Sequence, residues 1–319
     1  MPRRQPSRPA GLGGGPLPHG ALLVVTRIWP TAERPSLGAF VRDRVRGIPE
    51  IRVVKPRSQR LPWPVLYALL FLDAMRASGS IRGVEAHMVL PTGLVALVVA
   101  RLRRVPLVVY SHGRDVRGWQ RFPFTMRWLT RFVLRHADRV VTNSQDTAAH
   151  IREMGVEPMI APPGVDLGRF AVWPRPGARR VLYLGGRRRR KGYDVAVAVA
   201  DTLVGPGILE VQPDEVPRLM AEHDVVLVPS LAEPFGLVAV EAMAAGRWVV
   251  AADVGGLRDI VIDGVNGTLV SDGDYAGALA RVPDYDPQAL PATVERFSLA
   301  EWQRAMAAIW DEASKATHS

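Results

Sequence analysis

The stretch PSLAEPFGLVAVEAM at residues 229–243 decides the fold of this chain. It carries two carboxylates, Glu233 and Glu241, eight positions apart around a Pro-Phe-Gly turn that opens a helix-like pattern. Apolar strand-like runs flank it at 225–228 and 248–251. A helix that starts directly after a parallel strand points free backbone N–H groups at the strand end, where they can bind phosphate. Two carboxylates beside such a site favour a ligand that has both phosphate and sugar hydroxyls.

Short apolar runs alternate with longer helical patterns along the rest of the chain. This alternation predicts an α/β fold in which helices cover both faces of parallel sheets, with sites at the carboxyl ends of the strands. We expect strands near 21–26, 51–54, 85–89, 107–111, 139–143, 180–184, 208–211, 225–229, 248–251 and 267–270. We expect helices near 38–47, 65–77, 93–103, 122–136, 144–154, 193–203, 214–222, 236–245, 275–281, 287–296 and 299–315.

Prolines and glycines gather in the middle of the chain, in APPGVD at 161–166 and WPRPG at 173–177. Such density interrupts both helical and strand periodicity, so we place a domain boundary near residue 172. Residues 21–172 then form a first domain and 173–297 a second one, followed by a terminal helix in 298–319. Residues 1–20 are rich in Arg, Pro and Gly, and we interpret them as a disordered basic tail.

The composition excludes some classes of function. The chain of 319 residues has no cysteine, which rules out disulfides and cysteine-based zinc or redox sites. No apolar stretch reaches the length of roughly 18 residues that a membrane span needs. No apolar core typical of a signal peptide follows the tail, so we expect a cytoplasmic protein.

The charge is unevenly distributed. Residues 1–170 hold 26 Lys and Arg against 11 Asp and Glu, whereas residues 171–319 hold 15 against 20. An anionic partner of the first half would explain this, and so would an Arg-biased composition, because Arg outnumbers Lys 38 to 3. The apolar segment LPWPVLYALLFL at 61–72 lies in the basic half. It fits a helix at a membrane interface or a helix packed on its own sheet, and we favour the second interpretation.

Three further segments are candidates for a site. The turn GGRRRRKG at 185–192 opens the second domain's first helix, and its Lys191 and Arg187 could neutralise a diphosphate. His112 ends the strand 107–111 and is followed by a glycine. Gly38 ends the long loop after the first strand, where backbone could approach a phosphate. Two Asp-x-Asp sequences, at 272–274 and 284–286, are better explained by turns than by metal binding.

Taken in order, these motifs resemble the family-4 retaining glycosyltransferases, in a shortened form. The cassette from Glu233 to Glu241 is similar to that family's Glu-x7-Glu motif, and the resemblance extends over about residues 21–315. It continues in the second half through GRWVVAADVGGL at 246–257 and DGVNGTLV at 263–270. In the first half it includes HGRD at 112–115, ADRVVTNS at 137–144 and PGVD at 163–166.

The resemblance implies a GT-B fold, in which two Rossmann-like domains face a central cleft. It implies an acceptor-side first domain, a second domain that binds a nucleotide sugar, and a terminal helix that crosses back to the first domain. The donor is a substrate of unknown base, and the family needs no cofactor or metal. The resemblance also implies individual roles: Glu233 and His112 near the transferred sugar, Glu241 on the ribose, Lys191 on the diphosphate, backbone at Phe235, Gly236 and Leu237 on the diphosphate and sugar, and Gly38 on the donor side.

The chain departs from the family pattern in two places. The family often has an Arg five positions before the diphosphate Lys, and here that position is Gly186, with Arg187 one residue later. The region between about 203 and 225 also has room for only one strand and one short helix. Base contacts usually come from that region, so we do not assign the nucleotide base.

The function that follows is transfer of a sugar from a nucleotide sugar to an acceptor hydroxyl with retention, as a metal-independent hexosyltransferase. The acceptor would be a sugar or a lipid-linked sugar in cell-surface polysaccharide or glycolipid synthesis, and the basic first domain would meet an anionic inner membrane face. Three alternatives stay open: an inactive glycosyltransferase-like binding or scaffold protein, a nucleic-acid-binding protein, and a sugar-nucleotide epimerase. We expect no nucleic-acid partner, because no aromatic-interleaved basic motif is present.

Overall fold

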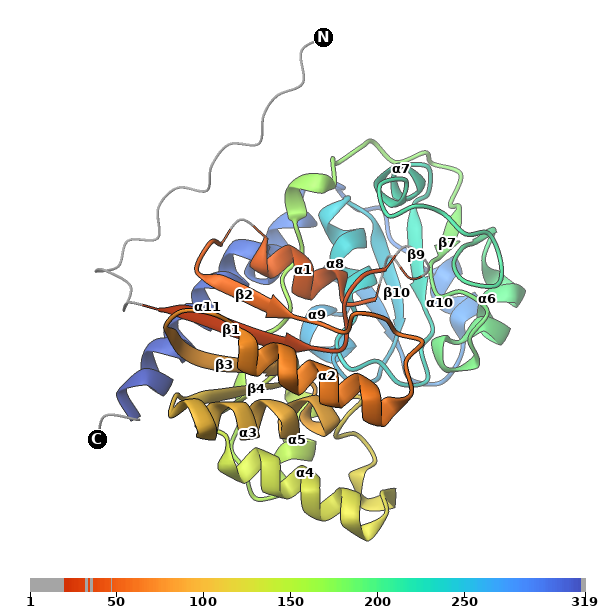
Figure 1. Ribbon diagram of the computed structural model, residues 1–319. Coiled ribbons are helices and arrows are strands. Elements are labelled where there is room, and N and C mark those ends of the chain that lie inside the picture. Colours follow the sequence, from red (N-terminus) through yellow and green to blue (C-terminus); the bar gives the residue numbers. More distant parts are fainter. Residues whose placement is uncertain (1–19, 32–33, 35–36, 47, 317–319) are drawn as a thin grey trace, which may run out of the picture.

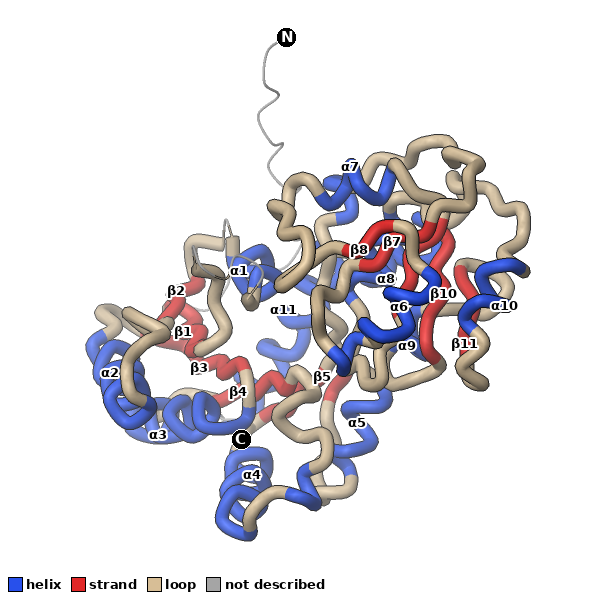
Figure 2. The backbone as a smooth tube through the Cα atoms, turned by 90° about the vertical axis from the view of Figure 1, so that its right-hand side faces the viewer, coloured by secondary structure: helices blue, strands red, loops and turns tan. Residues whose placement is uncertain are grey.

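The computed structural model describes residues 20–316, except 32–33, 35–36 and 47, so that the predicted tail lies outside the described residues apart from Gly20. The described chain forms two parallel sheets, each surrounded by helices (Figures 1 and 2). The chain therefore has the predicted α/β fold with two Rossmann-like units.

The first sheet has six strands in the order β2-β1-β3-β4-β5-β6, and all of its pairings are parallel. Its strands are β1 (Ala21–Thr26), β2 (Ile51–Val54), β3 (Ile81–His87), β4 (Leu107–Ser111), β5 (Arg139–Thr142) and β6 (Met159–Ile160). Its helices are α1 (Ala39–Val45), α2 (Trp63–Arg76), α3 (Leu94–Arg103), α4 (Phe124–His136) and α5 (Gln145–Arg152).

The second sheet has five strands in the order β11-β10-β9-β7-β8, again all parallel. Its strands are β7 (Val181–Tyr183), β8 (Thr202–Leu203), β9 (Val225–Val228), β10 (Trp248–Ala252) and β11 (Gly267–Val270). Its helices are α6 (Tyr193–Val199), α7 (Val216–Ala221), α8 (Leu237–Ala244), α9 (Leu257–Ile260) and α10 (Tyr275–Ala280), and a 3₁₀ segment (Pro291–Phe297) precedes α11 (Leu299–Ala316).

The strand order creates one crevice in each sheet. In the first sheet the chain moves outward from β1 to β2, then returns to place β3 on the other side of β1. The second sheet repeats this arrangement with β7, β8 and β9. Ligands of open α/β sheets bind at such switch points, outside the carboxyl ends of the strands. The loops after β1 and β3, and after β7 and β9, are therefore the places where a site is expected.

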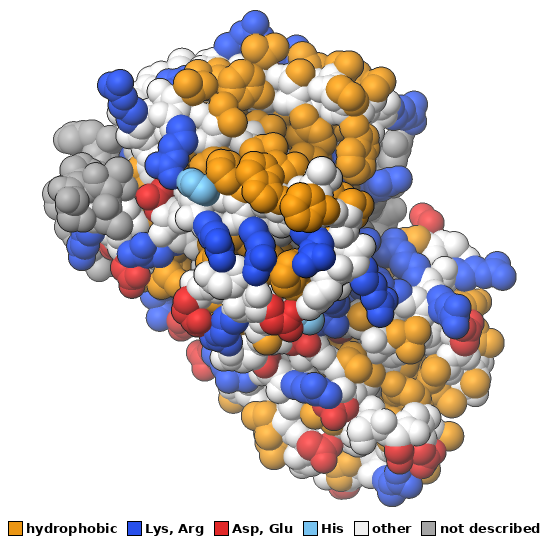
Figure 3. Space-filling view, turned by 90° about the horizontal axis from the view of Figure 1, so that it is seen from below, with side chains coloured by type: hydrophobic (Ala, Val, Ile, Leu, Met, Phe, Trp, Pro, Cys, Tyr) orange, Lys and Arg blue, Asp and Glu red, His pale blue; other side chains and the backbone are white. Residues whose placement is uncertain are grey.

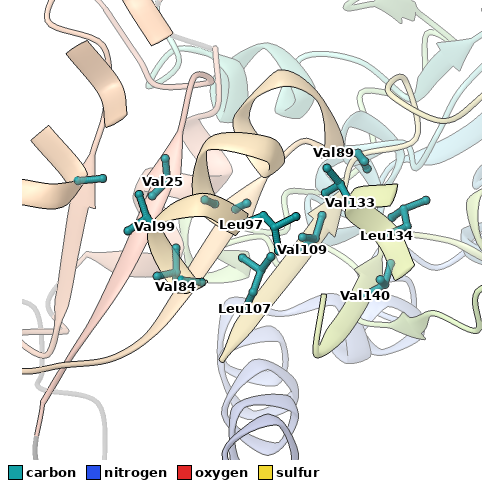
Figure 4. Packing of buried hydrophobic residues seen from close by; sticks show 14 of the residues in the cluster. Val25, Val84, Val89, Leu97, Val99, Leu107, Val109, Val133, Leu134 and Val140 are labelled. Atoms are coloured by element: carbon teal, nitrogen blue, oxygen red, sulfur yellow. The ribbon is translucent and has the colours of Figure 1, made fainter. Parts of the chain in front are cut away.

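Both faces of each sheet are buried. Alternate residues of β1 show this, since Leu23 and Val25 pack under α2, α3 and α4, whereas Leu22 and Val24 pack against α11. Figure 4 shows part of the first of these clusters, with Leu97 and Val99 of α3 over Val84 and Val109. Strands buried on both faces are continuous apolar runs rather than alternating ones, which is why the sequence pattern located them well.

The terminal helix α11 lies on the first sheet although it follows the second (Figure 1). Its Trp302, Met306, Ile309 and Trp310 are buried in the cluster that contains Leu22 and Val24. The two chain segments that connect the units run together, because Val165 N–H donates to Phe297 O at 2.9 Å and Leu299 N–H donates to Val165 O at 2.9 Å.

In the region before β9, one expected element is too long and one is wrong. The helix expected over 193–203 ends at Val199, and the chain enters strand β8 at Thr202. The strand expected at 208–211 does not form, because the turn around Gly205 and Gly207 leaves the side chains of Ile208 and Leu209 37% and 54% exposed. The short strand β6 was not expected, since two residues are too few to show a periodicity.

Candidate functional site

Lys191 and Glu233 meet at the switch point of the second sheet. Lys191 ends a 3₁₀ turn (Arg189–Lys191) after β7, and Glu233 lies in the loop between β9 and α8. Gly192, at φ 75°, lets the two loops touch, since a Cβ on it would lie 1.9 Å from Pro229 O. Lys191 Nζ lies 2.5 Å from Glu233 Oε2, and Ser230 Oγ donates to the same oxygen at 3.2 Å. The structure therefore brings these two predicted site residues together.

The helix α8 begins four residues after Glu233, at Leu237. Gly236 has φ 121°, a conformation that favours glycine, and its missing side chain leaves room for Leu257. Among the described residues, the N–H groups of Phe235 and Gly236 have no hydrogen-bond partner. The Phe235 ring is buried edge-on against Phe297, with centroids 5.5 Å apart. Phe235 therefore offers only backbone to a ligand, in agreement with the donor helix end that the cassette predicts.

Glu241 lies one turn along α8 and is half-buried. Burial raises the pKa of Glu241 to about 7, and only the charge of Arg169 opposes this shift. Within the described part of the chain, its carboxylate takes part in no hydrogen bond or ion pair. A half-buried carboxyl group without a partner is suited to accept hydrogen bonds from ligand hydroxyls.

His112 approaches the cassette from the first domain. A Cβ on Gly113, whose φ is 86°, would lie 2.7 Å from Pro234 Cβ, so this loop of the first unit contacts the Glu233 loop of the second. Asp115 holds the His112 loop by accepting hydrogen bonds from the Ser111 hydroxyl at 2.9 Å and the Val89 N–H at 2.8 Å. The structure therefore places His112 beside the Glu233 loop, although 121 positions separate them in the chain.

The His112 ring lies in an aromatic stack. Its centroid is 4.6 Å from that of Tyr110 and 5.1 Å from that of His87, and Phe40 meets it edge-on at 5.0 Å. Burial, together with His87, lowers the pKa of His112 well below its usual range, so the ring is neutral at pH 7. Gly38 begins α1 at φ 67°, and a Cβ there would lie 2.3 Å from Ile28 O. The glycine is thus required by the turn, and its contact with a phosphate stays a prediction.

Arg190, which the sequence interpretation missed, contacts the loop that contains Glu233. Arg190 Nη1 donates to Ala232 O at 3.1 Å, and burial with the neighbouring Arg114 lowers its pKa. Arg187 is exposed, and its guanidinium lies 6.0 Å from the centroid of the Tyr193 ring. Four consecutive arginines look alike in sequence, and only the direction of the 3₁₀ turn distinguishes them.

The Asp-x-Asp carboxylates serve local structure. Asp272 accepts from Asp274 N–H at 3.0 Å, Asp274 caps α10 through Gly277 N–H at 2.8 Å, and Asp284 pairs with Arg175 at 2.5 Å. In residues 20–316, apart from the gaps given above, no three His, Asp or Glu side chains gather as metal ligands. No helix in the same part of the chain has the length and apolarity needed to cross a bilayer.

Two family models match the chain, one to each sheet. A model described as glycosyltransferase family 4 matches residues 22–169, and one described as glycosyl transferases group 1 matches residues 175–282. Their boundary falls in the Pro- and Gly-rich connection between the two units.

Curated relatives with the name D-inositol 3-phosphate glycosyltransferase are similar over much of the chain. The Acidothermus cellulolyticus protein is 30% identical over 331 residues, which cover 80% of this chain and 71% of the relative. Glycosyltransferase 1 of Catenulispora acidiphila is 32% identical, over 68% of this chain and 67% of the relative. The Geodermatophilus obscurus protein is 35% identical, but that match spans only 46% of the relative's length.

Solved structures share the fold at low identity. Sucrose-phosphate synthase from Thermosynechococcus elongatus has a TM-score of 0.73 at 19% identity and covers 93% of this chain and all of its own. HepE from Anabaena, crystallised with UDP-glucose, has a TM-score of 0.70 at 20% identity over 92% of this chain and all of its own. The two Rossmann-like units, the Glu233–Lys191 switch point and these matches lead to one conclusion: the chain belongs to glycosyltransferase family 4 and has the GT-B fold.

Proposed function

We propose that this protein transfers a sugar from a nucleotide sugar to an acceptor hydroxyl, with retention of configuration. The observation that carries the proposal is the Lys191–Glu233 pair, 2.5 Å apart at the switch point and next to the open amino end of α8. A cation, free N–H groups and a carboxylate at one place match the diphosphate and the hydroxyls of such a donor.

Each donor group has a proposed partner. The diphosphate would contact Lys191, Arg190 and the N–H groups of Gly236 and Leu237, while Glu241 would accept hydrogen bonds from the ribose. Glu233 would contact the transferred sugar when the diphosphate draws Lys191 away from it. Because the helix end is in position before the reaction, its N–H groups stabilise the departing diphosphate without reorganisation.

The proposed reaction breaks the bond between the anomeric carbon and the diphosphate oxygen, and a bond from the acceptor oxygen forms on the same face. The acceptor proton passes to the departing diphosphate. We propose a hexosyl group and charge neutralisation by side chains rather than by a metal ion, so that treatment with EDTA leaves the rate unchanged.

The test is a thermal-shift screen of the full chain against UDP-, GDP-, ADP- and dTDP-sugars, followed by a transfer assay. UDP-glucose is the first donor to try, because HepE was crystallised with it. A stabilising donor whose anomeric configuration is kept in the product supports the proposal. If no donor raises the melting temperature, or if the product has the inverted anomeric configuration, the proposal is contradicted.

For the acceptor we propose an anionic molecule at a membrane, such as a lipid-linked sugar used in polysaccharide or glycolipid synthesis. The relatives' name suggests a second candidate, a phosphorylated polyol such as inositol phosphate. Both fit the basic first domain. Assays that offer each acceptor in turn, with the donor found by the screen, distinguish the two.

Peripheral association with an anionic membrane is supported by the surface of α4. Its Phe124, Met126 and Trp128 are 80%, 42% and 55% exposed, and the helix contains four cationic or titratable side chains but no acidic residue. The exposed face that holds α2, α3 and α4 at the bottom of Figure 1 is seen directly in Figure 3, where hydrophobic patches are bordered by Lys and Arg. A helix with exposed aromatic side chains and several arginines but no acidic residue is suited to a membrane interface.

A flotation assay with vesicles containing anionic lipid tests the membrane proposal. Phe124→Ser with Trp128→Ser should lower the bound fraction. Val197→Ser with Val265→Ser removes two side chains of the second domain that are 54% and 55% exposed, and should leave it unchanged. Equal binding by both double variants would reject the α4 surface.

The alternative is a glycosyltransferase-like binding or scaffold protein without activity. Slow hydrolysis of the donor by the full chain without acceptor, lost in Glu233→Gln, would exclude it. Donor binding without any turnover would favour it.

A further inference from the structure

Two buried side chains on β3, Glu85 and His87, connect to His112. Glu85 and His87 lie two residues apart on β3, so that they share one face of the sheet, and neither is exposed to solvent. His87 Nε2 lies 3.0 Å from Glu85 Oε1, and His87 Nδ1 lies 2.9 Å from His112 Nε2. The three groups thus form a line that ends at His112, next to the loop that contacts the Glu233 loop.

Glu85 is held as an anion. Burial alone would raise its pKa, but the Arg44 guanidinium, His87 and the Trp310 indole N–H bring the pKa of Glu85 to about 2. Arg44 forms an ion pair with Oε1, and Trp310 Nε1 donates to Oε2 at 3.0 Å. Every group around this carboxylate is a donor or a cation, so Glu85 can only accept.

An anionic Glu85 determines which nitrogen of His87 carries the proton. His87 Nε2 makes no hydrogen bond within the described residues. It lies 3.0 Å from Glu85 Oε1, however, and a lone pair on Nε2 would face that full negative charge. His87 is neutral, because burial lowers its pKa. With the proton on Nε2, its Nδ1 is an acceptor, and the partner at 2.9 Å, His112 Nε2, must donate.

We propose that Glu85 and His87 are positioning residues that hold His112 as the tautomer protonated on Nε2, with Nδ1 as a hydrogen-bond acceptor. In the described part of the chain Nδ1 has no hydrogen-bond partner. The group that fits an acceptor at Nδ1 is a hydroxyl of the transferred sugar or of the acceptor. A phosphate oxygen does not fit, because it needs a hydrogen-bond donor opposite it. This last step rests on the proposed glycosyltransferase function, whereas the tautomer does not.

Nitrogen-15 NMR of the full chain, labelled on histidine and free of donor, tests the tautomer directly. The chain has seven histidines, and His112→Asn identifies the signals of interest by their loss. The expected result is a pyridine-like Nδ1 and a pyrrole-like Nε2 for His112. A proton on Nδ1, or a doubly protonated ring, at pH 7.5 overturns the proposal. The tautomer is read from the spectrum of the native chain, and His112→Asn serves only to assign the signals.

Two variants test the role of His87. His87→Phe keeps a ring in the stack but removes the acceptor, so the Nδ1–H tautomer of His112 should become populated. Tyr110→Phe is the matched control, because Tyr110 is in the same stack and its hydroxyl bonds Ala161 O rather than His112. It should keep the native tautomer. An unchanged His112 spectrum in folded His87→Phe would show that His87 does not set it.

Kinetics connect the tautomer to the reaction. With the donor found by the screen, His87→Phe should lower kcat about three- to tenfold, the effect of one misdirected neutral hydrogen bond, with little change in donor Kd. If His112 has the expected tautomer but no donor is ever turned over, the proposed function fails and the positioning role stands. If transfer proceeds while Nδ1 carries the proton, the positioning role fails alone.

Discussion

The ammonium of Lys191 lies 2.5 Å from the carboxylate of Glu233, although the two residues are 42 positions apart and belong to different loops. They meet because β7 and β9 are neighbours in the sheet while β8, which lies between them in sequence, is placed outside. Both side chains are largely shielded from water, with exposures of 23% for Lys191 and 9% for Glu233. A ligand phosphate that replaces Glu233 as the partner of Lys191 would therefore bind a partly desolvated cation.

Lys191→Ala should lower kcat/KM for the donor about ten- to a hundred-fold, because one charge-assisted hydrogen bond to the departing diphosphate is lost. Arg189→Ala is the control, since Arg189 lies in the same 3₁₀ turn but is exposed. Steady-state transfer assays measure both. A Lys191→Ala variant with undiminished kcat/KM would remove Lys191 from the donor site.

Arg190→Ala should weaken donor binding by roughly tenfold, whereas Arg187→Ala should change it little. The reason is position, because Arg190 contacts the Glu233 loop and Arg187 lies over Tyr193. Titration of the nucleoside diphosphate by calorimetry is the measurement. The opposite order of effects would assign the diphosphate to Arg187 after all.

Glu241→Gln should change how stability depends on pH. The folded-state pKa of about 7 lies above the ordinary value of 4.5, so ionisation of Glu241 opposes folding. Native stability relative to the variant is therefore greatest below pH 4.5 and falls as the pH rises through about 7, by about 3 kcal/mol in all.

Urea unfolding of the native chain and Glu241→Gln at pH 5 and pH 8 measures this difference. We expect the variant to gain relative stability at pH 8. A constant difference between the two proteins at both pH values would mean that the Glu241 carboxyl is not held out of water.

Gly83→Ala should destabilise the first domain by about 1–3 kcal/mol, as overpacking does. A Cβ on Gly83 would lie 2.3 Å from Trp310 Cζ3, and the same indole donates to Glu85. Gly168→Ala is the control, because its nearest contact is an ordinary 3.5 Å. Thermal unfolding compares them. Equal melting temperatures for the two variants would show that α11 can shift at Trp310 without loss of stability.

Most of the second domain could be predicted because its signals are local. The strands on both sides of Glu233 are continuous apolar runs, and the Pro-Phe-Gly turn marks the start of α8 by backbone chemistry alone. The prediction failed at 200–211, directly after α6, whose Ala- and Val-rich residues suit helix and strand equally. There the Gly205 and Gly207 turn and the position of β8 at the sheet edge decided the outcome.

The sequence by itself determined the two α/β units, the cassette that contains Glu233 and Glu241, and the family, because periodicity, turn residues and motif spacing are properties of neighbouring positions. Only the tertiary structure decided that Arg190 rather than Arg187 approaches Glu233, and that Glu85 and His87 stand behind His112. It also decided that Trp310 reaches Glu85 from the far end of the chain. These relationships depend on strand order and on the path of α11, which bring together side chains that no local pattern connects.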